Sequence, residues 1–183
     1  MMYRKPGLTC RLWALTVVLL LPQGLFGLSP KEGWTVALGG IQSPKGVGLC
    51  ADFSRDATSF RSLAFTADLI DILDGTASTP GVKMTYYHNF VFKEWSEGKY
   101  ACYAGPGLMA GYVRDLSNHL GFAGGVSGDI GFRALCLKGI SVSVEFQADF
   151  VLQFKNRYRP DMSLYRAGYT HAYLPYVRIQ YRF

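Results

Sequence analysis

The sequence predicts an all-β protein, an eight-stranded antiparallel up-and-down transmembrane β-barrel. Apolar and polar side chains alternate with a period of two in segment after segment, which is the pattern of β-strands. Only 17% of the 183 residues are charged and 49% are hydrophobic, whereas about a quarter of a soluble domain is charged. The links between the segments are short at one end of the predicted sheet and mostly long at the other, as in membrane barrels.

The N-terminus, residues 1–27, predicts a cleaved signal peptide. A basic region ends at Arg11, ten apolar residues follow over 12–21, and cleavage is expected after Gly27. The apolar run is shorter than the roughly 20 residues of a membrane-spanning helix. We therefore expect export, with residues 28–183 forming the barrel domain.

The net charge gives no sign of a nucleic-acid partner. The chain carries +6, but three of its 19 basic residues and none of its 13 acidic ones lie in the predicted signal peptide, which leaves 16 basic residues and a charge of +3. These basic residues are scattered and form no block of like charge.

The first six predicted strands are 34–41, 47–54, 61–73, 82–95, 100–114 and 121–135. The seventh, 140–154, alternates most clearly, because Phe146 and Phe150 fall on a wholly apolar face while Glu145 and Asp149 fall on the other. The eighth, 173–183, repeats this alternation. The predicted turns at one end are 55–60, 96–99 and 136–139, and the loops at the other are 42–46, 74–80, 115–120 and 155–172.

Which face points inward decides the class of barrel. A soluble barrel would bury the apolar face, so a soluble periplasmic ligand-binding barrel stays open as an alternative. The polar face, however, is poor in charge for a water-exposed exterior, and an eight-stranded interior has room only for side chains. Turned inward, its five acidic and four basic residues would form a nearly neutral ionic network. These residues are Asp52, Asp68, Lys83, Asp129, Arg133, Glu145, Asp149, Arg178 and Arg182.

The signal peptide, the eight strands and the terminal aromatic residue together resemble the small outer-membrane β-barrel proteins of Gram-negative bacteria. In that superfamily the last strand ends on Phe, with apolar or aromatic residues at every second position before it. The matching residues are Tyr173, Val177, Ile179, Tyr181 and Phe183, and Pro175 departs from the pattern. The resemblance implies location in the outer membrane and recognition of the last strand by the barrel assembly machinery. It also implies contact with outer-membrane lipids and lipopolysaccharide, and a monomeric state.

Some barrels of this superfamily modify lipid A, so a lipid A-modifying enzyme is a further alternative. The deacylase type resembles a His-x-Ser pair on a lipid-facing strand, and no histidine here has Ser at that spacing. His88 falls on the apolar face of its strand, where Tyr103 or Tyr112 could satisfy it, but we predict no catalytic residue, no cofactor and no metal site. We interpret Cys50, Cys102 and Cys136 as small, mostly buried residues that allow one disulfide at most.

The loop 155–172 carries the candidate surface-binding residues. Arg157, Arg159 and Arg166 alternate there with tyrosines, and guanidinium groups suit bidentate binding of phosphate. We expect an outer-membrane protein with a structural or surface-interaction role through such extracellular loops, the partner being lipopolysaccharide or a protein.

Overall fold

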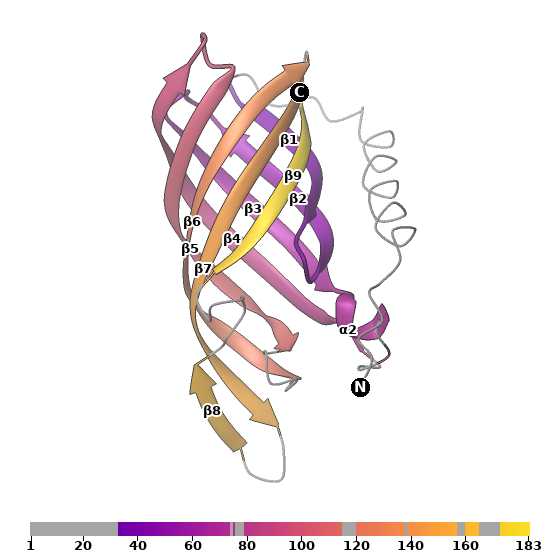
Figure 1. The fold of residues 1–183 in the computed structure, drawn as a ribbon. Helices are drawn as coiled ribbons and strands as arrows, with labels where there is room; N and C mark the ends of the chain where they lie inside the picture. Colours follow the sequence, from indigo (N-terminus) through magenta and orange to yellow (C-terminus); the bar gives the residue numbers. More distant parts are fainter. Residues whose placement is uncertain are drawn as a thin grey trace.

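The computed structural model contains one closed β-barrel (Figure 1). It describes residues 33–73, 75, 79–114, 120–137, 139–156, 160–164 and 173–183. The predicted signal peptide lies outside these residues. Within them, no helix is long and apolar enough to cross a membrane.

Eight strands form the barrel wall and one short strand extends it. The wall consists of β1 (Thr35–Gln42), β2 (Gly46–Ser54), β3 (Ser59–Asp68), β4 (Gly81–Trp95), β5 (Tyr100–Arg114), β6 (Leu120–Leu137), β7 (Ile140–Asn156) and β9 (Tyr173–Arg182). The short strand β8 (Pro160–Leu164) pairs only with the end of β7. A helix of four residues, α2 (Ile70–Leu73), follows β3.

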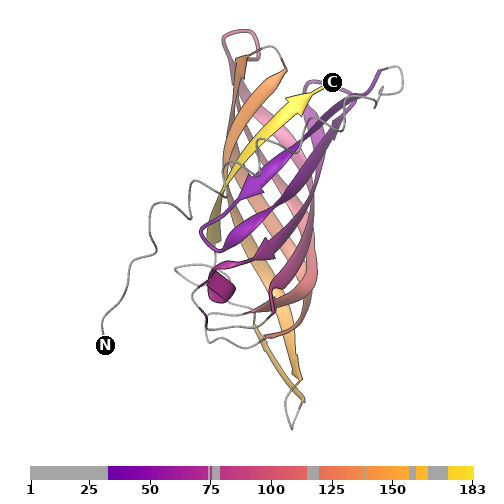
Figure 2. The ribbon, with the colours of Figure 1, turned by 90° about the vertical axis from the view of Figure 1, so that its right-hand side faces the viewer.

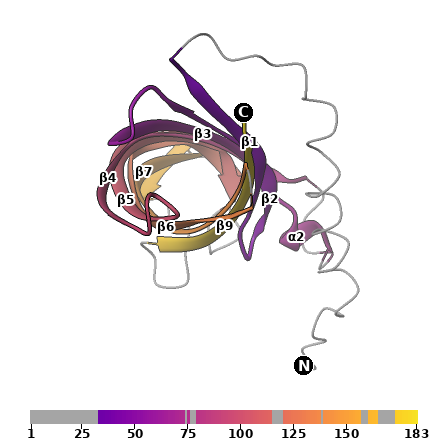
Figure 3. The same ribbon diagram turned by 90° about the horizontal axis from the view of Figure 1, so that it is seen from above.

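Every neighbouring pair of wall strands is antiparallel, and the first strand closes the ring with the last (Figure 3). Ala37 to Gln42 of β1 pair with Arg182 to Val177 of β9, and β9 pairs on its other edge with β7. Each of the eight wall strands therefore pairs with a neighbour on both sides, and among the described strands only the short β8 keeps an open edge. This confirms the predicted all-β fold, an eight-stranded antiparallel up-and-down barrel.

Two predicted elements differ from the structure. The third strand ends at Asp68 rather than at residue 73, because Ile70–Leu73 turns into α2. The predicted loop 155–172 is partly strand, since β7 continues to Asn156 and forms a hairpin with β8. Figure 2 shows α2 and the β7–β8 hairpin at the end of the barrel opposite the C-terminus.

The burial of the side chains alternates along the strands, and the polar set is the one that points inward. In β7, Glu145 and Asp149 are 0% and 6% exposed, whereas Phe146 and Phe150 between and beyond them are 46% and 73% exposed. Strands β3 and β4 repeat the pattern: Ser62, Thr66 and Lys83 are buried, and Phe65 is exposed. The barrel is thus apolar outside and polar inside.

The turns opposite α2 are tight. In the β2–β3 turn, the carboxylate of Asp56 accepts hydrogen bonds from the backbone N–H groups of Thr58 and Ser59 at 3.1 and 2.8 Å. In the β4–β5 turn, Glu97 and Gly98 have φ values of 57° and 81°, as a type I′ hairpin turn requires. Short turns of this kind hold the strands together at one end of the barrel.

Candidate functional site

Arg178, from β9, is the centre of the polar interior. Its guanidinium Nη1 donates to Asp52 Oδ1 of β2 at 3.1 Å and to Ser62 Oγ of β3 at 2.7 Å. Its Nε lies 3.1 Å from Glu145 Oε1 of β7. The side chain is 1% exposed, so one buried cation is compensated by two buried carboxylates from two different strands.

A second cation, Lys83 from β4, lies further toward the α2 end. Its Nζ is 3.3 Å from Asp149 Oδ2 and donates to Gln147 Oε1 at 3.3 Å. The ammonium also lies 5.0 Å from the centre of the Tyr176 ring. Ser127 Oγ donates to the other oxygen of Asp149 at 2.5 Å.

Gln147 joins these two clusters into one network. While its Oε1 accepts from Lys83, its Nε2 donates to Glu145 Oε1 at 2.7 Å. The chain of contacts therefore runs from Asp52 through Arg178, Glu145, Gln147 and Lys83 to Asp149. Most buried polar groups of the network are paired in this way, but among the described residues Nη2 of Arg178 has no hydrogen-bond partner.

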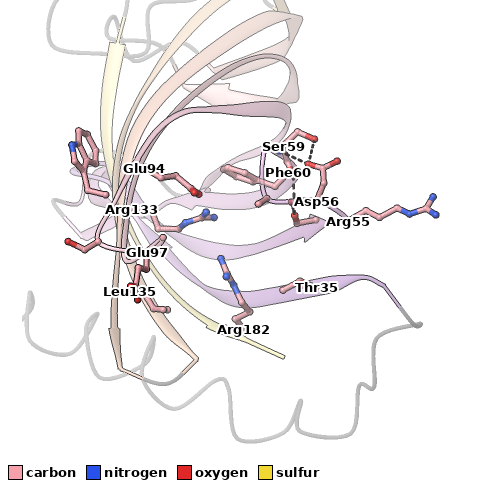
Figure 4. Close-up of a pocket in the computed structure, with 15 residues that line it drawn as sticks. Thr35, Arg55, Asp56, Ser59, Phe60, Glu94, Glu97, Arg133, Leu135 and Arg182 are labelled. Atoms are coloured by element: carbon pink, nitrogen blue, oxygen red, sulfur yellow. Dashed lines mark hydrogen bonds between the residues drawn. The ribbon is translucent and has the colours of Figure 1, made fainter.

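Three of the other predicted interior charges, Asp129, Arg133 and Arg182, lie apart from this network. Asp129 is buried and accepts a hydrogen bond from Asn89 Nδ2 at 3.1 Å. Asp68 is half-buried at the α2 end of β3. Arg133 and Arg182 lie at the short-turn end, where they line a pocket (Figure 4). The structure thus brings at least five of the nine residues into one network and places Asp129, Arg133 and Arg182 elsewhere.

Two aromatic side chains pack against each other inside the barrel next to that pocket. Phe60 and Tyr103 meet edge to face with ring centres 5.0 Å apart, and both are buried. Toward the opposite end, a cluster of Met109, Val113, Ala123 and Val151 is also buried. Large buried side chains therefore occupy the described interior toward both ends, as expected for eight strands.

Three buried tyrosines, Tyr87, Tyr103 and Tyr176, were not among the predicted interior residues. Tyr87 shares a hydrogen bond of 2.8 Å with Ser127, and Tyr103 donates to Glu145 at 3.1 Å. Tyr87 and Tyr176 lie in phase with the polar face of their strands, which is the signal that could have identified them, whereas the positions in phase with Tyr103 in β5 are glycines and apolar residues and give no such signal. A side chain that is both aromatic and polar suits either face, so phase alone decides its direction.

The exterior carries a belt of large apolar side chains with aromatic clusters at both ends. At the short-turn end, Tyr100 stacks on Phe132 at 6.1 Å, and Tyr181 contacts Phe183 at 5.0 Å. At the other end, the ring centres of Tyr112 and Phe122 are 4.9 Å apart. Of the other last-strand residues predicted as an assembly signal, Val177 is exposed and Ile179 is half-buried. The backbone of Tyr173 belongs to β9, and its side chain lies outside the described part.

His88 lies on the outer face of β4, beside another aromatic ring. The ring is 4.7 Å from that of Phe90 on the outer face. Tyr103, considered from sequence as a partner, points into the barrel instead and bonds Glu145. Among the described residues, no three His, Cys, Asp or Glu side chains gather as a metal site requires.

The cysteines differ from the sequence-based interpretation in one respect. Cys50 is buried, Cys102 is half-buried and Cys136, beside the β6–β7 turn, is exposed, so the expectation of burial was wrong for Cys136. All three are free thiols. The candidate surface residues Arg157, Arg159 and Arg166 lie outside the described residues.

A solved structure shares this architecture. It is the N-terminal β-barrel domain of OprF from Pseudomonas aeruginosa, which is 9% identical, with a TM-score of 0.49 over 82% of this chain and 96% of that chain. Comparisons with protein-family models and with curated proteins find no match. The function therefore has to be inferred from this chain's own residues.

Proposed function

We propose that this chain is an integral outer-membrane β-barrel protein with no catalytic site, which acts structurally or through its extracellular loops. The observation that carries the proposal is the inverted burial of the strands. Phe150 is 73% exposed, whereas its neighbour Asp149 is 6% exposed and ion-paired inside the barrel. Hydrocarbon is the solvent that suits such an exterior.

The size of the apolar belt supports lipid over water. Large hydrophobic side chains are exposed on every wall strand beyond β1, including Leu49, Phe65, Met84, Leu108, Phe122, Phe150 and Val177. Soluble monomers rarely expose contiguous apolar patches of more than a few hundred Å². The soluble ligand-binding alternative requires the opposite orientation of these faces, and the strands do not have it.

The aromatic clusters at both ends support the same proposal. Amphipathic rings favour the lipid–water interfaces, where they form girdles around the apolar band of a membrane barrel. Trp95, Tyr100 and Phe132 would belong to one girdle, and Tyr112 and Phe122 to the other. On this arrangement the short turns face the periplasm and the α2 end faces outward.

The filled interior supports a role other than bulk transport. The side chains of Tyr87, Gln147 and Arg178 are each at most 1% exposed. They therefore occupy the space that an open channel would need. We assign the interaction with the surroundings to the outer loops, and we propose that the protein is a monomer that contacts outer-membrane lipids and lipopolysaccharide.

Membrane fractionation tests the proposal for location. We expect the full chain, expressed in a Gram-negative host, to remain in the outer-membrane fraction after alkaline extraction. It should also migrate as a compact form on gels unless it is heated. Recovery from the periplasm without detergent would contradict the proposal.

The proposed loop contact has a separate test. Replacing Arg157, Arg159 and Arg166 together with Gln should weaken binding of the purified protein to lipopolysaccharide, because each guanidinium removed is a phosphate ligand. Arg61→Gln, a single change on the exposed face of β3, serves as the control. Equal binding by the triple variant and the wild type would remove the loop from the proposal while leaving the location intact.

A further inference from the structure

A pocket of about 710 Å³ opens at the short-turn end of the barrel. It is surrounded by the β2–β3 and β4–β5 turns, the beginning of β1 and the end of β9. Its volume lies in the range of small-molecule sites. Figure 4 shows Glu94, Arg133 and Arg182 directed into it from three different strands.

Neither arginine in the pocket has an anionic partner. In the part of the chain that the structure describes, no ion pair or hydrogen bond joins the side chain of Arg133 or Arg182 to a carboxylate. Figure 4 shows the two guanidinium groups directed into the same cavity. Each of the more deeply buried cations, by contrast, has a carboxylate within 3.3 Å.

Among the described residues, no acidic side chain of the lining forms an ion pair with Arg133 or Arg182. Asp56 is already engaged by the backbone and hydroxyl groups of Thr58 and Ser59. Glu94 attracts Arg182 without forming an ion pair with it. The whole lining holds three basic and three acidic side chains, but the groups that Figure 4 shows directed into the cavity include the guanidinium groups of both Arg133 and Arg182, while Arg55 points away from it.

The surroundings hold the side chain of Arg133 and the backbone of Arg182 in place. The guanidinium of Arg133 lies over the Phe60 ring, 5.0 Å from its centre, an arrangement that leaves its N–H edge available for hydrogen bonds. The backbone at Arg182 is anchored on both sides, because its N–H donates to Gly139 at 2.6 Å and that of Phe183 donates to Val36 at 2.8 Å. Preorganised donors bind more tightly, since less side-chain freedom is lost.

The geometry points to a phosphate-class anion, either free phosphate or a small phosphate monoester, bound between Arg133 and Arg182. A planar carboxylate is satisfied by the fork of a single guanidinium. These two guanidinium groups come from β6 and β9, which are separated by β7, and a tetrahedral anion presents oxygens to both at once. The site involves neither the interior network nor the outer loops.

Titration calorimetry on the full chain in detergent tests the proposal with inorganic phosphate as the probe. We expect saturable binding that weakens with added salt. Arg133→Gln and Arg182→Gln should each weaken it roughly 10- to 100-fold, because each removes a charge-assisted contact. Glu94→Gln should tighten it several-fold, since it removes a carboxylate that is directed into the cavity, and an improvement of this kind cannot arise from misfolding.

Arg61→Gln is the matched control, because Arg61 is exposed on the outer face of β3, and it should bind as the wild type does. Glycerol phosphate separates the two sources: tighter binding than phosphate identifies a monoester, and weaker binding identifies the free ion. Absence of saturable phosphate binding by the wild type would overturn the proposal. So would tighter binding of succinate, or no loss of affinity in the variant lacking both arginines.

Discussion

Arg178 is the residue whose loss should damage the barrel most. Arg178→Met would leave Asp52 and Glu145 buried without their cation, and breaking a buried ion pair on one side costs about 3–5 kcal/mol. We expect that loss in the free energy of unfolding, measured by urea titration in lipid vesicles. The exposed Arg61→Gln should change it by less than about 0.5 kcal/mol.

A triple variant distinguishes charge from packing at the same position. Adding Asp52→Asn and Glu145→Gln to Arg178→Met removes the uncompensated carboxylates, and replacement of a complete buried ionic group is often neutral. We therefore expect most of the lost stability to return. If the triple variant is as unstable as the single one, the guanidinium contributes by filling space and not by neutralising charge.

Gly131 gives a second prediction for a single residue. A Cβ built there would lie 2.3 Å from Cζ of Tyr103, the residue opposite it in β5. Gly131→Ala should therefore lower the free energy of unfolding by about 1–3 kcal/mol. The same change in a Tyr103→Ala background should cost much less, because the ring is gone.

Gly124→Ala, in the same strand, is the matched control for Gly131→Ala. Its added Cβ would meet no atom nearer than 3.9 Å. We expect no loss of stability there, as measured in the same urea titration. A comparable loss at Gly124 would show that β6 tolerates no side chain at either position, whatever Tyr103 does.

The β2–β3 turn predicts a dependence on pH. The backbone N–H of Ser59, with further donors from Thr58 and Ser59, lowers the pKa of Asp56 below its ordinary value of 3.8. The unfolded carboxyl therefore binds a proton before the folded one does. Its contribution to stability is present above about pH 4 and is lost as the pH falls through the folded pKa.

Asp56→Ala tests the assignment of that pH dependence. The variant should unfold more readily than the wild type at pH 6, and the difference between them should shrink at pH 2 to 3, as judged by tryptophan fluorescence during urea titration. A difference that stays constant over this range would mean that the turn does not depend on the ionised carboxylate.

At the level of elements, the sequence was sufficient for the strands and insufficient for their ends. Alternation determines both the strand and the face, as in β7, where Glu145 and Phe146 fall on opposite sides. It could not separate Ile70–Leu73 from the third strand, because a short apolar run fits a helix or a strand equally well. The end of the predicted third strand forms α2 instead, because the chain reverses direction after Asp68, and no local sequence pattern encodes this reversal.

The candidate site was predictable in composition and unpredictable in pairing. The sequence places Arg178 and Glu145 on the inner face, but their contact depends on the register between β7 and β9. Tyr103 fits inside because Gly131 lies opposite it, and this complementarity appears only when two strands are aligned. That Arg133 and Arg182 form no ion pair likewise depends on the three-dimensional positions of the ends of β6 and β9, which the sequence pattern does not give.

The whole barrel should show how strongly its exterior depends on lipid. A charged side chain at the middle of a lipid-facing strand costs about 2–4 kcal/mol, and one near the interface costs about 0–1 kcal/mol. Phe150→Arg places a charge in the middle of the exposed face of β7, whereas Tyr100→Arg places it in the aromatic cluster at the short-turn end. We expect Phe150→Arg to reduce folding into lipid vesicles strongly and Tyr100→Arg to reduce it slightly.

The same pair of variants separates a membrane barrel from a soluble one. In water, an exposed Phe replaced by Arg loses little and gains solubility, because the apolar surface shrinks. A soluble barrel would therefore tolerate both changes equally. Folding yield into vesicles, followed by the shift between compact and heated forms on gels, gives the measurement. A larger loss at the centre of the belt than at its edge requires a solvent that changes with depth along the strand, and only a bilayer has that property.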